Sequence, residues 1–283
     1  MIKAIVLDID GVVVGNLEGV NFPNPSINIQ NALHQIMKSG ISISFLTAKP
    51  SFAAQKNIEA LNINSPHVAT NGAVIFNPVK KTIIEITPLE TESVNEILDL
   101  LPKHIYISLF ATNEYFLQKH QISEITKKYS SIVDKKPTIV NDFKNVLNKE
   151  AITKLNITAS TSDDHTIIEN VFSQLKNKVD YTWGTHPYIF PIQILNVTKK
   201  GVSKKMGVEK LSQYMQVPLE NILGVGDTML DWEFLNICGY KGTMKNGTPE
   251  LVAKFDFTDP KQFMGNHVNE DGLIDVFRYF KLI

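Results

Sequence analysis

Two aspartates stand at the end of a strongly apolar segment near the start of the chain. Residues 2–7 are apolar at almost every position, which is typical of a strand buried on both faces of a parallel sheet. The segment ends at Asp8 and Asp10, and Gly11 then allows a sharp turn. Buried carboxylates need a partner, and Mg2+ prefers oxygen ligands and keeps waters that a phosphate can replace. Because ligands bind at the carboxyl ends of parallel strands, this pattern predicts a metal and phosphate site, with a simple polar turn as the alternative.

Reactive side chains also follow other predicted strands. The segment 41–46 is followed by Thr47, whose hydroxyl can hold a phosphate but which equally fits the start of a helix. The very apolar segment 221–225 is followed by Asp227 and then Asp231. All of these groups can converge at one edge of a parallel sheet, because the carboxyl ends of parallel strands meet there.

Phosphoryl transfer requires a set of this kind. A carboxylate nucleophile forms an aspartyl phosphate, and a second carboxylate protonates the leaving alkoxide and then activates water. Cations and hydrogen-bond donors neutralise the phosphoryl oxygens. Lys204 lies in the first turn of a helix predicted over 202–214, where its charge and the helix N-terminus both favour phosphate. Lys200 competes for this role.

The alternation of elements predicts an α/β protein with an insertion. Strands and helices alternate over 1–81 and 191–283, which predicts a Rossmann-like, doubly wound parallel sheet. Between them, 82–190 has short strands and helices without this regularity, which predicts a separate α+β unit inserted in the sheet domain. Within the core, Asn28 is expected to cap a helix and 255–258 to form the last strand.

Composition describes an ordinary globular protein. The chain has 283 residues, with 43% hydrophobic and 20% charged residues and a formal net charge of −1. This charge gives no reason to expect a nucleic acid or membrane partner. The single cysteine, Cys238, allows no intramolecular disulfide. No apolar run approaches membrane-spanning length and no secretory layout is present, so we expect a cytoplasmic protein.

Taken in order, the motifs resemble the haloacid dehalogenase-like (HAD) superfamily. More narrowly, they resemble its Cof-type phosphatases, which carry an α+β cap (C2 cap) between the second and third motifs. The resemblance covers the whole chain and rests on DIDG at 8–11, Thr47, GVSK at 201–204 and GDTMLD at 226–231. Further local matches are Asn71-Gly72-Ala73, Asn246-Gly247 and Asp271-Gly272.

The resemblance implies an Mg2+-dependent phosphatase that hydrolyses a small phosphomonoester, such as a sugar phosphate. It implies that Asp8 is the nucleophile and metal ligand, and that Asp10 is the general acid–base and a ligand through its backbone carbonyl. Asp227 would be the remaining protein ligand. Thr47 and Lys204 would hold the phosphoryl group.

The resemblance also implies a supporting set, and the chain departs from the family pattern at two places. Residues implied to bind the phosphate or to support the site are Gly11, Ala48, Asn71 and Asp231, the last by supporting Asp227 or Lys204. After Thr47 the chain has Ala48-Lys49 where the family usually has Gly-Arg, so the cation loses its bidentate fork. Leu230 stands where the family usually has Asn, which removes one polar contact.

Two other functions fit the same residues. A phosphotransferase or sugar-phosphate mutase, as in the similar phosphomannomutases, would turn substrate over without releasing phosphate. A non-catalytic phosphate-binding module, like a receiver domain, would show no steady-state turnover. The physiological substrate and the oligomeric state stay open. So does the role of the aromatic group near the end of the cap, which either packs or contacts substrate: Trp183, His186, Tyr188 and Phe190.

Overall fold

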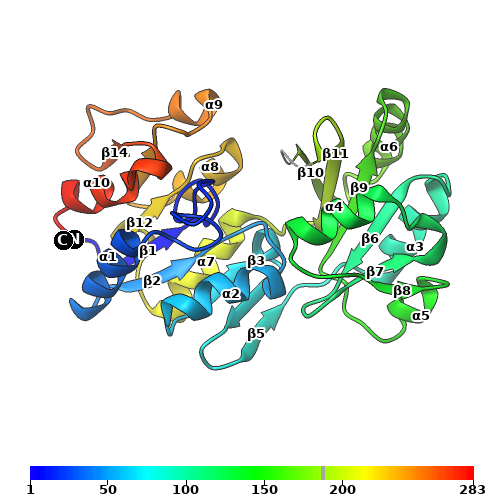
Figure 1. The fold of residues 1–283 in the computed structure, drawn as a ribbon, viewed down its shortest axis with the longest axis horizontal. Helices are drawn as coiled ribbons and strands as arrows, with labels where there is room; N and C mark the ends of the chain where they lie inside the picture. The colour runs from blue at the N-terminus through cyan, green and yellow to red at the C-terminus, as the bar shows by residue number, and fades with distance from the viewer. Residues whose placement is uncertain (186–188) are drawn as a thin grey trace. The chain divides into compact units, whose positions relative to one another are not determined.

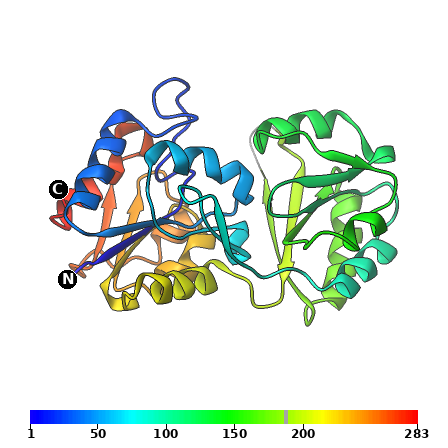
Figure 2. The same ribbon diagram turned by 90° about the horizontal axis from the view of Figure 1, so that it is seen from below.

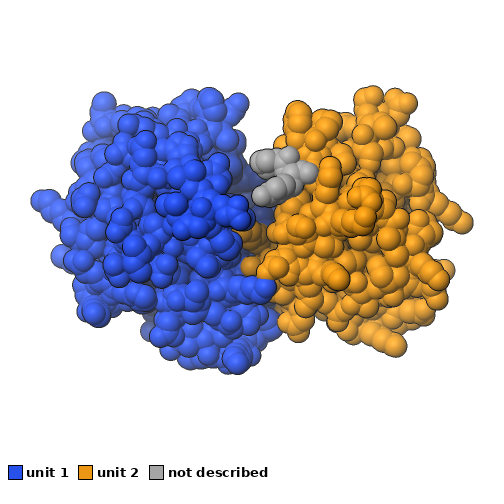
Figure 3. Space-filling model, viewed as in Figure 1, with its two compact units in different colours: residues 1–48, 54–85, 203–283 blue, residues 49–53, 86–202 orange. Residues whose placement is uncertain are grey.

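The structure is a computed structural model that describes residues 1–185 and 189–283 (Figure 1). Within this part of the chain the strands form a five-stranded, a six-stranded and a three-stranded sheet. The chain divides into two compact units (Figure 3). Unit 1 comprises residues 1–48, 54–85 and 203–283, and unit 2 comprises 49–53 and 86–202.

The central sheet of unit 1 is parallel, and the first strand of the chain lies inside it rather than at an edge. Its strands run in the order β14-β13-β12-β1-β2, and each neighbouring pair is parallel. Their bounds are β1 (Ala4–Leu7), β2 (Ser42–Phe45), β12 (Ile222–Val225), β13 (Tyr240–Met244) and β14 (Gln262–Gly265). The chain therefore winds outward from β1 in one direction and from β12 in the other. The carboxyl ends of β1 and β12 meet at the point where the strand order reverses, which is where such sheets bind ligands.

Helices cover both faces of this sheet, and its adjacent inner strands β1 and β12 are apolar and buried at every position. Figure 2 shows α1 (Ile27–Lys38) and α7 (Lys204–Met215) on opposite faces. Val208 and Leu211 of α7 are fully buried in a cluster that also contains β1 and β12 side chains. The remaining helices of unit 1 are α2 (Ser51–Leu61, whose first residues belong to unit 2), α8 (Trp232–Leu235), α9 (Pro249–Val252) and α10 (Gly272–Tyr279).

A three-stranded sheet continues from the β2 side of unit 1. It consists of β3 (His67–Ala69), β4 (Val74–Asn77) and β5 (Thr82–Ile86), with the short helix η1 (Thr70–Gly72) between β3 and β4. Unit 1 also contains η4 (Leu219–Asn221), η5 (Met229–Asp231) and η6 (Val268–Glu270).

Unit 2 is built on a mostly antiparallel sheet. The strand order is β10-β11-β9-β6-β7-β8, and only the β7–β8 pair is parallel among its described pairs. The strands are β6 (Tyr106–Phe110), β7 (Tyr115–Gln118), β8 (Thr138–Val140), β9 (Lys154–Ala159), β10 (Val179–Thr185) and β11 (Gln193–Lys199). The helices are α3 (Thr91–Leu100), η2 (Lys119–Gln121), α4 (Glu124–Ile132), α5 (Lys144–Leu147) and α6 (Ser162–Gln174). Leu155 and Ile157 of β9 are buried in one core with Ile168 and Phe172 of α6.

The predicted fold class is confirmed, but the domain boundaries differ from the expected ones. Residues 191–202 were expected in the core, whereas β11 pairs with both β9 and β10 inside the sheet of unit 2. Residues 82–85 belong to unit 1, because β5 pairs with β4. Residues 49–53 belong to unit 2, where the Phe52 ring stacks on Phe110 with the ring centroids 6.4 Å apart.

Two local predictions are wrong. The α1 cap is Ser26, whose hydroxyl accepts the Ile29 N–H, while Asn28 instead donates to Asp271. Residues 255–258 form a turn rather than a strand, because the Asp256 carboxylate accepts both the backbone and the hydroxyl hydrogen of Thr258. The last strand is β14. Among the described residues, no helix combines the length and apolar character needed to cross a bilayer.

Candidate active site

One lysine lies between two of the predicted carboxylates. Asp8 directly follows β1, and Lys204 is the first residue of α7. The Lys204 Nζ donates to Asp8 Oδ2 at 2.8 Å and to Asp231 Oδ1 at 2.6 Å. The side chains of Lys204 and Asp231 are 4% and 0% exposed, so this ion pair is removed from water. A buried pair of this kind requires additional hydrogen bonds to offset its desolvation.

Asp231 supplies those additional hydrogen bonds. Its Oδ2 accepts the backbone N–H of Asp227 at 3.0 Å and of Thr228 at 2.9 Å, and it also accepts the Thr228 hydroxyl at 3.1 Å. Both Asp231 oxygens are therefore engaged within the protein. This makes Asp231 a support for Lys204 and for the turn after β12 rather than a free ligand.

The three aspartates differ in how strongly their charged forms are stabilised. Burial raises the pKa of Asp8 to about 7, although the nearby Lys204 charge offsets part of the effect. Burial also raises the pKa of Asp227 to about 8, with the Asp8 and Asp231 charges adding to it. Burial alone would raise the pKa of Asp231, but the Lys204 charge outweighs it and the pKa is lowered. Burial alone would lower the pKa of Lys204, but Asp231 and Asp8 hold it above its usual value.

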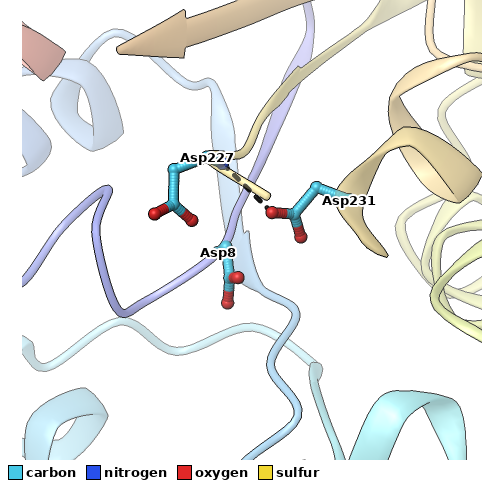
Figure 4. A group of neighbouring side chains, drawn as sticks. All are labelled: Asp8, Asp227 and Asp231. Atoms are coloured by element: carbon cyan, nitrogen blue, oxygen red, sulfur yellow. Dashed lines mark hydrogen bonds between the residues drawn. The ribbon is translucent and has the colours of Figure 1, made fainter. Parts of the chain in front are cut away.

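The carboxylates of Asp8, Asp227 and Asp231 lie close together. One oxygen from each lies within 4.8 Å of the others, and Figure 4 shows the three carboxylates side by side. Within the part of the chain that the structure describes, the buried Asp227 Oδ1 has no hydrogen-bond partner. An orphaned carboxylate oxygen beside a second carboxylate is the chemistry of a divalent cation site.

Gly11 forms one wall of this group. Its φ is +75°, and a Cβ at this position would lie 2.0 Å from Asp227 Oδ2. Only glycine allows the turn after Asp10 to approach the Asp227 carboxylate this closely. The turn after β1, which carries Asp10 and Gly11, and the turn after β12, which carries Asp227, are the two acid-bearing turns. They are in contact through the Gly11 backbone and the Asp227 side chain.

The predicted phosphate-binding residues lie on neighbouring segments of unit 1. Thr47 is 2% exposed, its N–H donates to the Val68 carbonyl and its carbonyl accepts the Asn71 N–H at 3.1 Å. Gly72 follows with φ +115°, and a Cβ there would lie 2.4 Å from the carbonyl oxygen of Ser203. Ser203 caps α7, so the segment around η1 packs against the helix start that carries Lys204.

The other predicted residues have more varied positions. Asp10 is exposed and forms an isolated β-bridge with Val14. Ala48 is the last residue of the first segment of unit 1, residues 1–48. Lys200, the competing lysine, lies in unit 2 and pairs with Asp180 at 2.6 Å. Of the two departures from the family pattern, Lys49 belongs to unit 2 and Leu230 is 38% exposed.

The aromatic group near the end of unit 2 is not a single cluster. Trp183 stacks on His165 with the ring centroids 4.2 Å apart, and its indole N–H donates to Glu169. Phe190 is 74% exposed. His186 and Tyr188 lie outside the described residues.

Comparison with known proteins decides the family. The family model described as haloacid dehalogenase-like hydrolase matches residues 5–277. The chain belongs to this family. As a haloacid dehalogenase-like hydrolase it is an enzyme of the phosphoric monoester hydrolase class, so the non-catalytic alternative is set aside.

Similar hydrolases and solved structures span nearly the whole chain. The 5-amino-6-(5-phospho-D-ribitylamino)uracil phosphatase YitU of Bacillus subtilis (strain 168) is 22% identical over 261 residues, covering 86% of each chain. The phosphoglycolate phosphatase of Staphylothermus marinus is 21% identical over 267 residues, covering 92% of each. The HAD phosphatase BT1666 from Bacteroides thetaiotaomicron superposes with a TM-score of 0.81 at 20% identity, covering 100% of this chain and 96% of that one.

Sequence reasoning missed the residues that hold the two acid-bearing turns together. The Asn246 Nδ2 donates to the Gly11 carbonyl at 2.8 Å, and the Thr248 N–H donates to the Asp227 carbonyl at 2.8 Å. The Asn246-Gly247 pair stood out in the sequence only as a local family match. No local signal connects it to a turn that lies 235 residues earlier.

Proposed function

We propose that the chain is an Mg2+-dependent phosphatase that hydrolyses a small phosphomonoester through an aspartyl phosphate on Asp8. The observation that carries this proposal is the arrangement of Asp8, Lys204 and Asp227 at the carboxyl ends of β1 and β12. Asp8 accepts one hydrogen bond from Lys204, and Asp227 keeps an oxygen without a partner among the described residues. The proposed nucleophile, a lysine ammonium group and the proposed metal ligand therefore lie together at the edge of the sheet where such folds bind ligands.

The metal would be held by the Asp8 and Asp227 carboxylates and the Asp10 carbonyl. When bound, Mg2+ would neutralise charge on the phosphoryl oxygens. Asp231 is a poor ligand because both of its oxygens already accept hydrogen bonds. Its role in this proposal is to hold Lys204.

The chain's own groups would carry the reaction in two steps. The Asp8 carboxylate attacks phosphorus, the bond from phosphorus to the substrate oxygen breaks, and Asp10 gives that oxygen its proton. Asp10 then removes a proton from water, whose oxygen attacks phosphorus and releases Asp8 and inorganic phosphate. Lys204 and Thr47 hold the phosphoryl oxygens during both steps.

Further residues would support the phosphoryl group, and unit 2 would select the substrate. We assign supporting roles to Gly11, Ala48, Asn71 and Asp231. The substrate would be a small phosphorylated metabolite such as a sugar phosphate. This is supported by the likeness to the HAD subclass IIB sugar phosphatase BT4131, whose structure superposes with a TM-score of 0.78 at 20% identity over 99% of this chain.

Substitution of Asp8 tests the proposal. Asp8→Asn is nearly isosteric but removes the nucleophile, so hydrolysis of an aryl phosphate in Mg2+ should fall by at least about 10³-fold while the unfolding midpoint stays similar. Phosphate release is measured for the wild type and the variant, with and without EDTA. Substantial turnover by a clean variant preparation, or full wild-type activity in excess EDTA, would overturn the proposal.

A further inference from the structure

The turn that follows β13 contacts the backbone of both acid-bearing turns. The side-chain Nδ2 of Asn246 donates to the Gly11 carbonyl at 2.8 Å. Two residues later, the Thr248 N–H donates to the Asp227 carbonyl at 2.8 Å. The segment 245–248 therefore spans the gap between the turn after β1 and the turn after β12, without using either carboxylate.

The Asn246 amide is fixed at both of its ends. Its Oδ1 accepts the Val268 N–H at 2.8 Å, while its Nδ2 donates to Gly11. The Gly11 carbonyl can only accept and the Val268 amide can only donate, so the orientation of the side-chain amide is unambiguous. Asn246 is thereby held as a rigid link between Gly11 and the backbone ahead of α10.

The position of Gly11 matters because of how closely it approaches Asp227. A Cβ on Gly11 would lie 2.0 Å from Asp227 Oδ2, so the turn backbone packs directly against that carboxylate. The other oxygen, Asp227 Oδ1, is buried without a hydrogen-bond partner among the described residues. A small shift of Gly11 would therefore change the space and direction available to the orphaned oxygen.

We propose that Asn246 is a positioning residue for the metal site. It holds Gly11 against Asp227, so that the carboxylate is already oriented before a cation binds. It does not touch the cation itself. This inference rests on the proposed function, because it assumes that Asp8 and Asp227 hold Mg2+. Outer residues that orient ligands in this way typically change metal affinity by about 10–100-fold when they are removed.

Calorimetric titration with Mg2+ tests the proposal on the full chain. Asn246→Ala should raise the Kd for Mg2+ by at least about tenfold. The matched control is Asn77→Ala, because the Asn77 amide also donates to one segment (Asn64, 3.0 Å) and accepts from another (Lys80 N–H, 3.1 Å). Asn77 is only 4% exposed, so the control should lower the unfolding midpoint, yet its Kd should stay within about twofold of wild type.

Steady-state kinetics give a second readout. Excess Mg2+ should return kcat of Asn246→Ala toward the wild-type value, because the substitution weakens metal binding and leaves Asp8, Thr47 and Lys204 in place. Asn246→Ser is used in the same way if the alanine variant does not fold.

Three outcomes decide the matter. A wild-type Kd in the foldable Asn246 variant would overturn the inference. An equal loss of affinity in Asn77→Ala would do so too, because it would mean general loosening. Failure of the proposed function looks different: the wild-type protein itself would bind no Mg2+ or would hydrolyse no phosphomonoester. That failure is read from the wild-type protein alone, whereas the inference about Asn246 is read from the ratio of variant to wild-type Kd.

Discussion

At the scale of single residues, two lysines close in sequence have opposite surroundings. Lys204 is buried between two carboxylates, whereas the Lys200–Asp180 pair has side chains that are 52% and 38% exposed. Removing one partner of a buried ion network leaves uncompensated charge, while an exposed pair is screened by water.

This contrast gives a paired prediction. Lys204→Ala should lower the free energy of unfolding by about 3–5 kcal/mol and abolish measurable phosphatase turnover. Lys200→Ala should change the free energy of unfolding by about 0–1 kcal/mol and leave turnover intact. Urea unfolding and phosphate release are compared for both variants. Equal effects of the two substitutions would contradict the assignment of Lys204.

The two raised carboxyl pKa values predict how metal affinity depends on pH. Carboxylates that bind a metal must be ionised, and the pKa values of the two proposed ligands, Asp8 and Asp227, are about 7 and about 8 without a cation. Mg2+ must therefore displace protons below these values, and its Kd should fall as pH rises from about 6 to about 8, by up to about tenfold per unit for each proton. Above this window the Kd should level off. Calorimetry across the range checks this, and a Kd independent of pH would contradict it.

The same groups act on the stability of the metal-free protein. Their folded-state pKa values lie above the ordinary 3.8 of an aspartate, so between about pH 4 and pH 8 the folded chain binds more protons than the unfolded chain. Their contribution to stability is therefore present at low pH and is lost as pH rises through that window. Mg2+ should restore stability most strongly at the upper end, because it binds only the folded protein.

At the scale of elements, a buried histidine joins β2 to β3. His67 is fully buried; its Nδ1 accepts the Phe45 N–H at 3.0 Å, and its Nε2 lies 3.1 Å from the Ile63 carbonyl. This pattern requires a neutral ring with the proton on Nε2. Burial lowers the pKa of His67 to about 4. The ring therefore joins the start of β3 to the end of β2, the strand that leads to Thr47.

The neutral ring predicts an acid-sensitive contact. Between about pH 4 and pH 6.5 the unfolded chain binds more protons at His67 than the folded chain does, so this contribution to stability falls as pH is lowered. Against His67→Gln, which does not titrate, the wild-type advantage in unfolding free energy should shrink by up to about 1.4 kcal/mol per pH unit. The difference isolates His67, since Asp8 and Asp227 titrate in both proteins. A constant difference across pH 4–7 would show that the ring is not neutral.

At the scale of the whole molecule, unit 1 contains every residue that we assign to catalysis. Asp8, Thr47, Lys204 and Asp227 lie in unit 1, which also has a buried cluster of its own. Unit 2 has a separate core around β9 and α6. The division of the chain is thus also a division between reaction chemistry and, in our proposal, substrate selection.

Excision of unit 2 tests this division. Replacing residues 86–202 by a short Gly/Ser linker should leave a protein that unfolds cooperatively and binds Mg2+. The design should include Phe52→Ser, because Phe52 stacks on Phe110 and Tyr115 of unit 2 and would otherwise be exposed. Selectivity among sugar phosphates should be lost to a greater extent than hydrolysis of an aryl phosphate. An excised protein that cannot fold, or that keeps full selectivity, would contradict the division.

The sequence by itself determined the family and the doubly wound core, and it predicted a set of reactive residues. These follow from local signals: an apolar run ending in Asp8, a predicted helix with Lys204 in its first turn, and a second apolar run before Asp227. Periodicity and burial are properties of short segments, so short segments report them well.

Only the tertiary structure decided which of these groups touch and where the units divide. Lys204 meets Asp8 across 196 residues of sequence, and Asn246 reaches Gly11 across 235. The tertiary structure also decided that β11 pairs with β9. The physical reason is that strand pairing and side-chain contacts between distant segments depend on the order in which strands assemble into sheets, which no local pattern of residue types encodes.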